Sequence, residues 1–273
     1  EKAGNASVQA FDSHHRLYQR RLFPGRDEER ISDSYRCFCG AAGKIAVSGG
    51  KVGLQMVLSV KALQEMKPVI DIMAAGTAMR FLTAYLSVTE GSHLITGTER
   101  MKQRPIRILV DALRSLGAQI KYAGNEGFPP LKITGTELTQ SEISLPGNVS
   151  SQYISALLMI GPMLAHGLNL ELEGEIISRP YINLTLKVMK DFGAKAEWTS
   201  DHTLQVAPQP YHPVPYYVES DWSAASYWYA FAALTPRATL RLPDLYQDSL
   251  QGDARVAELF SRLGVSTTYH EKY

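Results

Sequence analysis

The feature that most constrains this fold is a pattern that occurs three times: a helix, a closing glycine and then a strand. The three closing glycines, Gly117, Gly193 and Gly264, are spaced almost evenly along the chain. Proline favours the start of a helix and glycine its end, so Arg104-Pro105 and Arg179-Pro180 are expected to open the first two of these helices. Because the spacing exceeds the roughly 50 residues of solenoid repeats, the pattern predicts larger repeated α/β units.

The other half of each unit recurs as well. Helices are expected to open at Gly76-Thr77, at residues 150–152 and at residues 221–223, and strands should follow over 93–97, 168–174 and 238–242. Each unit therefore contains a helix, a strand, a second helix and a hairpin-like pair of strands. The fold class predicted is α+β (mixed α/β), with pseudo-symmetric domains whose sheets close around buried helices.

Composition excludes several functional classes. The 273 residues are 45% hydrophobic and 20% charged with a formal net charge of +1, too balanced to favour a nucleic-acid or anionic-membrane partner. The longest apolar run, residues 154–165, is too short to span a bilayer. Two cysteines, Cys37 and Cys39, provide no disulfide framework, so a cytoplasmic protein is expected.

No metal site is expected. His14 and His15 with Cys37 and Cys39 fit none of the common zinc spacings, and adjacent histidines cannot easily point at one ion. Residues 1–66 follow no persistent apolar period, apart from a helical pattern after Val57, and are treated as a divergent segment. We predict one domain over residues 67–219 and the start of a second over 220–273, after the prolines at 213 and 215.

The candidate chemistry lies where helices begin. The turn at residues 74–80 (AAGTAMR) follows the predicted strand 69–73 and opens a helix, an arrangement that suits a bound anion. Including this turn, each repeat places groups that could contact an anion where its helices begin. These are Gly76, Thr77, Arg100, Lys102, Arg104, Ser150, Ser151, Gln152, Ser178, Arg179 and Tyr181. Two structural alternatives remain open: Ser150 as an ordinary helix cap, and residues 100–104 as a solvated turn.

These motifs resemble those of the 5-enolpyruvylshikimate-3-phosphate (EPSP) synthase family, the 3-phosphoshikimate 1-carboxyvinyltransferases. The matching stretches are AAGTAMR at 74–80, TGTERMKQRPIRILVDALRSLG at 96–117, GNVSSQYISALL at 147–158, ISRPYINLTL at 177–186, VESDWSAASY at 218–227 and QGD at 251–253. The resemblance implies the enolpyruvyl transferase fold: two pseudo-threefold domains, each of three βαβαββ units, the second incomplete here.

The resemblance also implies a reaction and a set of site residues. The family adds the 5-hydroxyl of shikimate 3-phosphate to phosphoenolpyruvate and releases phosphate, without a cofactor, in the pathway to aromatic amino acids. Gly76, Arg104 and Gln152 would hold phosphoenolpyruvate. Shikimate 3-phosphate would be held by Thr77, Ser150, Ser151, Gln152, Ser178 and Tyr181.

Some family features have no counterpart in this sequence. The family's N-terminal lysine and serine do not match within residues 1–66, and its proton-transfer carboxylates would lie beyond Tyr273, so no catalytic acid or base is assigned and the chain as written is expected to turn over poorly. A complete chain is expected to be a monomer. Two alternatives stay open. One is a UDP-N-acetylglucosamine enolpyruvyl transferase, although residues 100–104 lack the cysteine common in that family. The other is a non-catalytic, truncated or degenerate anion-binding chain.

Overall fold

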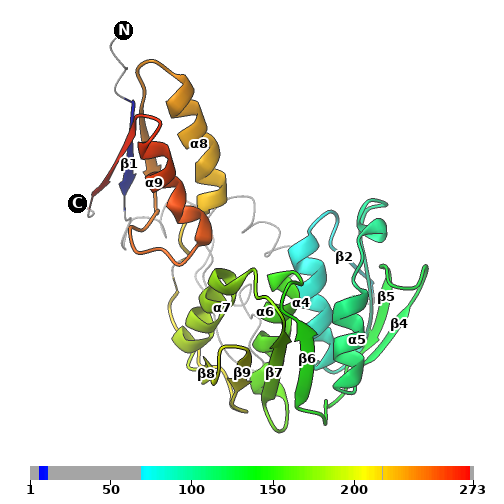
Figure 1. The fold of residues 1–273 in the computed structure, drawn as a ribbon. Helices are drawn as coiled ribbons and strands as arrows, with labels where there is room; N and C mark the ends of the chain where they lie inside the picture. The colour runs from blue at the N-terminus through cyan, green and yellow to red at the C-terminus, as the bar shows by residue number, and fades with distance from the viewer. Residues whose placement is uncertain (1–5, 12–68, 217, 271–273) are drawn as a thin grey trace, which may run out of the picture. The chain divides into compact units, whose positions relative to one another are not determined.

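The structure is a computed structural model that describes residues 6–11, 69–216 and 218–270 (Figure 1). Two compact units are present. The larger unit comprises residues 69–216, and the smaller unit combines residues 6–11 with 218–270. The helical pattern after Val57 and the two histidines and two cysteines considered as metal ligands lie outside the described residues.

The larger unit contains two successive βαβαββ units. The first consists of β2 (Val69–Asp71), α4 (Gly76–Ser87), β3 (Ser92–Thr96), α5 (Arg107–Ser115), β4 (Gln119–Tyr122) and β5 (Leu131–Thr134). The second consists of β6 (Glu142–Pro146), α6 (Ser151–Ile160), β7 (Leu168–Glu173), α7 (Arg179–Asp191), β8 (Ala196–Trp198) and β9 (Thr203–Val206). The repeat predicted from the helices and glycines is thus confirmed as a mixed α/β architecture.

The two sheets of the larger unit have the same topology. Their strand orders are β2-β3-β5-β4 and β6-β7-β9-β8. In each sheet the first pair is parallel, with Ile70 opposite Ile95 and Ile143 opposite Leu170, and the remaining pairs are antiparallel. Since a parallel pair needs a crossover connection, each unit must pass through a helix between its first two strands. That helix is α4 in one unit and α6 in the other.

The core of the larger unit lies around α4 and α6, which pack against each other. Of the ten residues of α6, seven are buried, from Tyr153 to Ile160, so this helix is covered on nearly every side. A helix that is apolar all round belongs in a core rather than at a surface. Helix α6 is therefore one of the buried helices that the sequence predicted. Among the described residues, no helix is long and apolar enough to cross a membrane.

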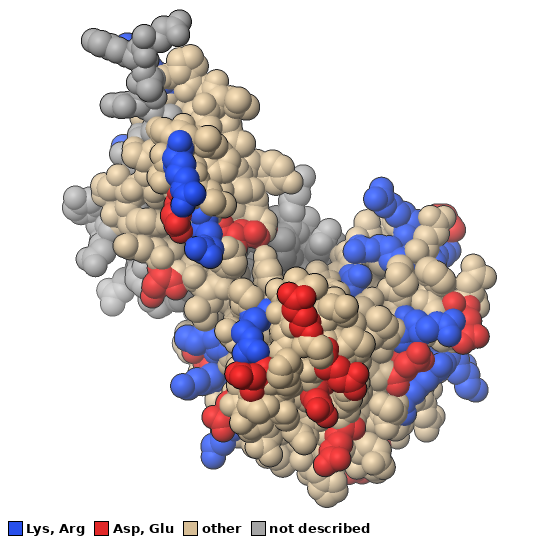
Figure 2. Space-filling view, in the orientation of Figure 1, with Lys and Arg blue, Asp and Glu red and all other residues tan. Residues whose placement is uncertain are grey.

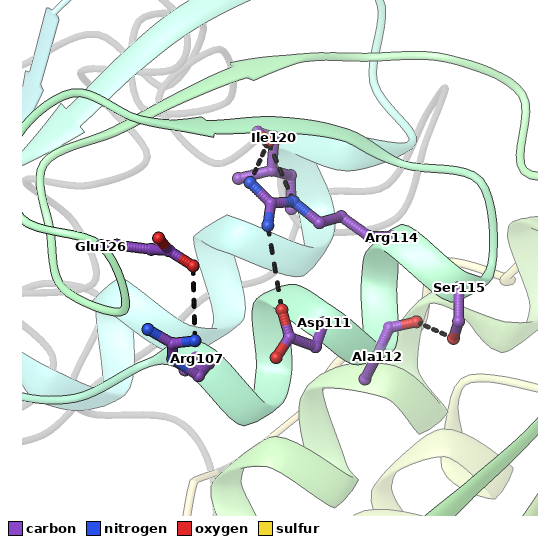
Figure 3. Close-up of polar contacts among 7 residues, drawn as sticks. All are labelled: Arg107, Asp111, Ala112, Arg114, Ser115, Ile120 and Glu126. Carbon is purple, nitrogen blue, oxygen red and sulfur yellow. Dashed lines mark hydrogen bonds and ion pairs between the residues drawn. The ribbon is translucent and has the colours of Figure 1, made fainter.

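Helix α5 shows how a surface helix is fixed between core and solvent (Figure 3). It buries Leu109 and Leu113, while Arg114 donates from Nε and Nη2 to the carbonyl oxygen of Ile120 at 3.1 and 2.8 Å. Gly117, which joins α5 to β4, has a φ of +108°. Gly193 and Gly264 also have positive φ, at +84° and +82°, so the predicted role of the three closing glycines is confirmed.

The predicted start of α5 is wrong by a few residues. Arg104 and Pro105 precede the helix, which begins at Arg107, and a short 3-10 helix, η1 (Met101–Gln103), comes before them. Arg104 has φ −91° and ψ 121°, because the residue before a proline is pushed into the extended region. The strand expected over residues 69–73 is likewise shorter and ends at Asp71. Met73 follows it at a φ of +53°.

The smaller unit contains β1 (Ala6–Phe11), α8 (Trp222–Leu234), β10 (Thr239–Pro243), η3 (Gly252–Arg255), α9 (Val256–Ser261) and β11 (Val265–His270). Its sheet has the order β10-β1-β11, and β1 is parallel to both neighbours. No helix or strand was predicted for residues 6–11, which form β1. Their strand is the centre of a sheet whose other strands lie more than 200 residues later in the chain.

Candidate anion-binding site

The site begins at the turn between β2 and α4. The backbone N–H of Met73 donates to Oδ1 of Asp71 at 2.8 Å, and the N–H of Ala75 donates to the carbonyl oxygen of Ile72 at 3.0 Å. These bonds close the turn directly before Gly76, the first residue of α4. The first N–H groups of a helix have no partner within the helix, so they are available to an anion.

Two guanidinium groups converge over Gly76. A Cβ atom placed on this glycine would lie less than 3.0 Å from Nη1 of Arg104 and from Nη1 of Arg80. The absence of a side chain at Gly76 therefore leaves room for both guanidinium groups to approach the start of α4. The guanidinium of Arg104 makes no hydrogen bond or ion pair with any other described residue. Its charge is available to a ligand.

The first turn of α6 lies beside the first turn of α4. Nε2 of Gln152 donates to Oγ1 of Thr77 at 3.0 Å, which links the first turn of α6 to the first turn of α4. Ser150 occupies the N-cap position of α6, but its side chain makes no capping hydrogen bond. The alternative of Ser150 as a side-chain cap is therefore wrong. Ser150 is exposed at the helix start, next to the partly buried Ser151.

The loop after β3 forms a pocket of about 340 Å³ beside this turn. It is lined by Ala74, Thr98, Arg100, Met101 and Arg104. Within the basic run 100–104, Met101 is buried and Lys102 pairs with Glu99 at 2.7 Å. Arg100 and Arg104 line the pocket and are exposed, so they are open both to solvent and to a ligand.

The start of α7 supplies the remaining predicted residues. Ser178 is the N-cap residue and makes no side-chain capping bond, and Tyr181 lies in the first turn with 40% of its surface exposed. Helix α7 packs on α6, where the hydroxyls of Ser155 and Thr185 are 2.7 Å apart. Helix α6 therefore contacts the two other helices whose starts carry predicted site residues.

Other charges of the larger unit are engaged elsewhere. Arg107 of α5 pairs with Glu126 at 3.3 Å, and Arg114 lies 3.8 Å from Asp111 (Figure 3). Figure 2 shows acidic side chains gathered over β6 and β7, where Glu142, Glu171 and Glu173 are exposed. Among the described residues, no group of three or more His, Cys, Asp or Glu side chains could hold a metal ion. The start of α4, where Arg80 and Arg104 approach Gly76, is therefore the described feature best suited to bind a small anion.

The comparison with known families agrees with this geometry. The family model described as EPSP synthase (3-phosphoshikimate 1-carboxyvinyltransferase) matches residues 47–273. The chain belongs to the EPSP synthase family.

Curated relatives support the same family. A 3-phosphoshikimate 1-carboxyvinyltransferase from Bacteroides fragilis is 70% identical over 212 residues, which are 78% of this chain and 52% of the relative. One from a Marinomonas species is 41% identical over 197 residues, 71% of this chain and 46% of the relative. The chain thus spans about half the length of the curated relatives it matches.

A solved structure shows the fold. The EPSP synthase of Acinetobacter baumannii superposes with a TM-score of 0.63 at 21% identity, over 86% of this chain and 54% of that chain. This superposition confirms the enolpyruvyl transferase fold predicted from the sequence.

In this member of the EPSP synthase family, two further residues, Arg80 and Tyr153, belong to the candidate site but were not predicted from the sequence. Arg80 lies one helical turn after Gly76, a spacing that puts both on one face of α4 and could have indicated a shared site. Tyr153 follows Gln152 and belongs to the hydrophobic core. Its side-chain contacts depend on tertiary packing alone.

Proposed function

We propose that this chain takes part in the transfer of the enolpyruvyl group from phosphoenolpyruvate to the 5-hydroxyl of shikimate 3-phosphate, with release of phosphate. The observation that carries the proposal is the pair of guanidinium groups over Gly76 at the start of α4, in a chain of the EPSP synthase family. Both substrates are small phosphorylated acids. Bringing them together requires cations that offset their negative charge.

The proposed roles follow from position. Gly76, Arg104 and Gln152 hold phosphoenolpyruvate, because the open helix start and the guanidinium of Arg104 adjoin one another. Shikimate 3-phosphate is bound by the starts of α6 and α7. The residues concerned are Thr77, Ser150, Ser151, Gln152, Ser178 and Tyr181. Groups fixed in place before the substrates arrive stabilise developing charge without reorganising, which is a major source of enzymatic rate enhancement.

The alternative substrate, a UDP-amino sugar, is less well supported. The curated relatives that match most of this chain are named for 3-phosphoshikimate, and the loop of residues 97–106 contains no cysteine. We further propose that the working protein is a monomer and that its chain crosses between domains near residue 219.

The test is ligand binding followed by turnover. Isothermal titration should show binding of shikimate 3-phosphate and of phosphoenolpyruvate, and Gln152→Ala should weaken both. Arg107→Ala, which removes a guanidinium already paired with Glu126, is the matched control and should bind normally. Phosphate release should then be measured with the chain alone and with the C-terminal half of the Bacteroides fragilis relative added.

Two results would count against the proposal. One is a failure of the unchanged protein to bind shikimate 3-phosphate. The other is equal binding of a UDP-amino sugar in its place, which would favour the alternative transferase.

A further inference from the structure

We infer that Tyr153 is a positioning residue for both arginines that flank Gly76. Its ring supports the guanidinium of Arg80, and its hydroxyl fixes the loop that carries Arg104. The inference rests on the proposed function, which it deepens by assigning the support of the phosphoenolpyruvate site.

The first contact is between Arg80 and the Tyr153 ring. The guanidinium carbon of Arg80 lies 5.3 Å from the ring centroid, within the range of a cation–π interaction. Nε of Arg80 is buried and has no hydrogen-bond partner among the described residues. Nη1 of the same group is the atom that lies close to Gly76. The ring therefore holds one side of Arg80 while the other side faces the anion site.

The second contact leads to Arg104. The hydroxyl of Tyr153 donates to the carbonyl oxygen of Pro105 at 2.9 Å. Pro105 is the residue directly after Arg104, and the backbone N–H of Arg104 donates to the carbonyl oxygen of Met101 at 3.0 Å. Arg104 is exposed, so its position depends on these backbone bonds rather than on the packing of its own side chain.

Both contacts come from one rigid side chain. Tyr153 is only 7% exposed and sits in the first turn of α6, directly after Gln152. Two guanidinium groups that converge without a bound anion repel each other, so each needs a support that keeps it from swinging away. A packed aromatic ring on a core helix provides that support at little entropic cost, because only two side-chain torsions are fixed.

The test compares Tyr153→Phe, which keeps the ring, with Tyr153→Leu, which loses ring and hydroxyl. Loss of a neutral hydrogen bond of about 1 kcal/mol predicts roughly fivefold weaker phosphoenolpyruvate binding in Tyr153→Phe. Adding the loss of a cation–π contact predicts a reduction of about 25-fold in Tyr153→Leu. Affinity for shikimate 3-phosphate alone should not change, because neither arginine is assigned to that ligand.

Tyr211→Phe is the matched control. The Tyr211 hydroxyl donates to the carbonyl oxygen of Met159 at 2.9 Å, so it also ties α6 to a loop, away from Gly76. This variant should lose similar thermal stability but keep its affinity for phosphoenolpyruvate. A second measurement needs no substrate: the side-chain Nε–H signal of Arg80 in NMR spectra should shift in Tyr153→Leu, where the ring is absent, and stay in place in Tyr211→Phe.

Inorganic phosphate is titrated beside phosphoenolpyruvate, so that the two proposals can fail separately. Phosphate binding that weakens in Tyr153→Leu, without any phosphoenolpyruvate binding by the unchanged protein, would contradict the proposed function and support the positioning role. Equal affinities in Tyr153→Leu and Tyr211→Phe, or a parallel loss of shikimate 3-phosphate binding, would overturn the positioning role alone. Binding of neither anion by the unchanged protein would overturn both.

Discussion

At the scale of single residues, Arg104 and Ser150 contribute to the site in different ways. Loss of a charged hydrogen-bond donor costs about 1.5–3 kcal/mol, whereas a neutral hydroxyl contributes about 1 kcal/mol. We therefore expect Arg104→Ala to weaken phosphoenolpyruvate binding by roughly 10- to 100-fold, and Ser150→Ala to weaken shikimate 3-phosphate binding by no more than about fivefold. Isothermal titration of both variants checks the ranking, and equal losses would show that geometry rather than charge dominates.

Gly76 offers a test that separates binding from stability. A methyl group here would collide with the guanidinium ends of Arg80 and Arg104, which are flexible and can move aside. Gly76→Ala should therefore fold with an unchanged melting temperature and yet bind phosphoenolpyruvate more weakly. Gly124→Ala, whose Cβ would lie 3.5 Å from Pro130, is the control that should alter neither property. A large drop in the melting temperature of Gly76→Ala would point instead to a backbone requirement.

Tyr122 predicts a dependence on pH. Its hydroxyl is buried without a hydrogen-bond partner among the described residues, and burial raises the pKa of this phenol, with the nearby Asp111 carboxylate adding to the effect. A raised pKa in the folded state means that the stability contribution is complete below the unfolded pKa, near 10.0, and is lost as the pH rises above it.

Tyr122→Phe removes this group. We expect the variant to be at least as stable as the unchanged protein at neutral pH and to lose less stability above pH 10, measured as the free energy of unfolding in urea at several pH values. A variant that is markedly less stable at pH 7 would show that the hydroxyl has a partner after all.

At the scale of elements, the junction between α5 and β4 depends on the backbone of Gly117. Its φ of +108° is costly for other residues, while an added Cβ would find no atom closer than 3.8 Å. Gly117→Ala should therefore lose about 1–2 kcal/mol of unfolding free energy through backbone strain alone. Denaturant titration measures the loss, with the Gly124→Ala variant as the reference. Little or no loss would mean that the turn can adopt another conformation.

At the scale of the whole molecule, the chain passes from the larger unit to the smaller unit directly after Tyr216. Up to Tyr216 the chain is tied to the larger unit, through the ring contact of Phe192 with Tyr216 and the hydrogen bond from His212 to Phe192. From Glu219 on it is tied to the smaller unit, since the Glu219 carboxylate accepts from Trp222, Tyr246, Ser249 and Gln251.

Limited proteolysis should therefore cut near residues 217–218 and leave a resistant core ending close to Tyr217. Mass spectrometry of the fragments identifies the cleavage site. A stable fragment running unbroken through Asp253 would contradict a domain crossing at this position.

Much of the fold could be predicted because its signals are local. Helix α7 begins at Arg179 as Pro180 indicated, and β4 follows Gly117 as the repeated pattern of helix, glycine and strand predicted. The start of α5 was predicted too early because Pro105 has two opposing effects on the local backbone. Pro105 favours an extended Arg104 as well as a helix, and the structure shows the extended form.

The candidate site could be predicted in part. The start of α4 and its glycine are visible in the sequence, because a strand pattern, a glycine and a helical pattern follow one another within residues 69–86. Arg80 could have been found from its spacing one turn after Gly76, but Tyr153 could not, since an aromatic ring against a guanidinium of another helix leaves no trace in residue spacing.

The sequence by itself determined the repeat, the class of fold and the family, because these depend on periodicity, turn residues and motifs that are continuous in the chain. Only the tertiary structure decided that β1 pairs with β10 and β11, and that Arg80, Arg104 and Tyr153 meet around Gly76. The physical reason is distance along the chain. Pairing and packing between remote segments are selected by the burial of whole elements, which no local pattern of residues records.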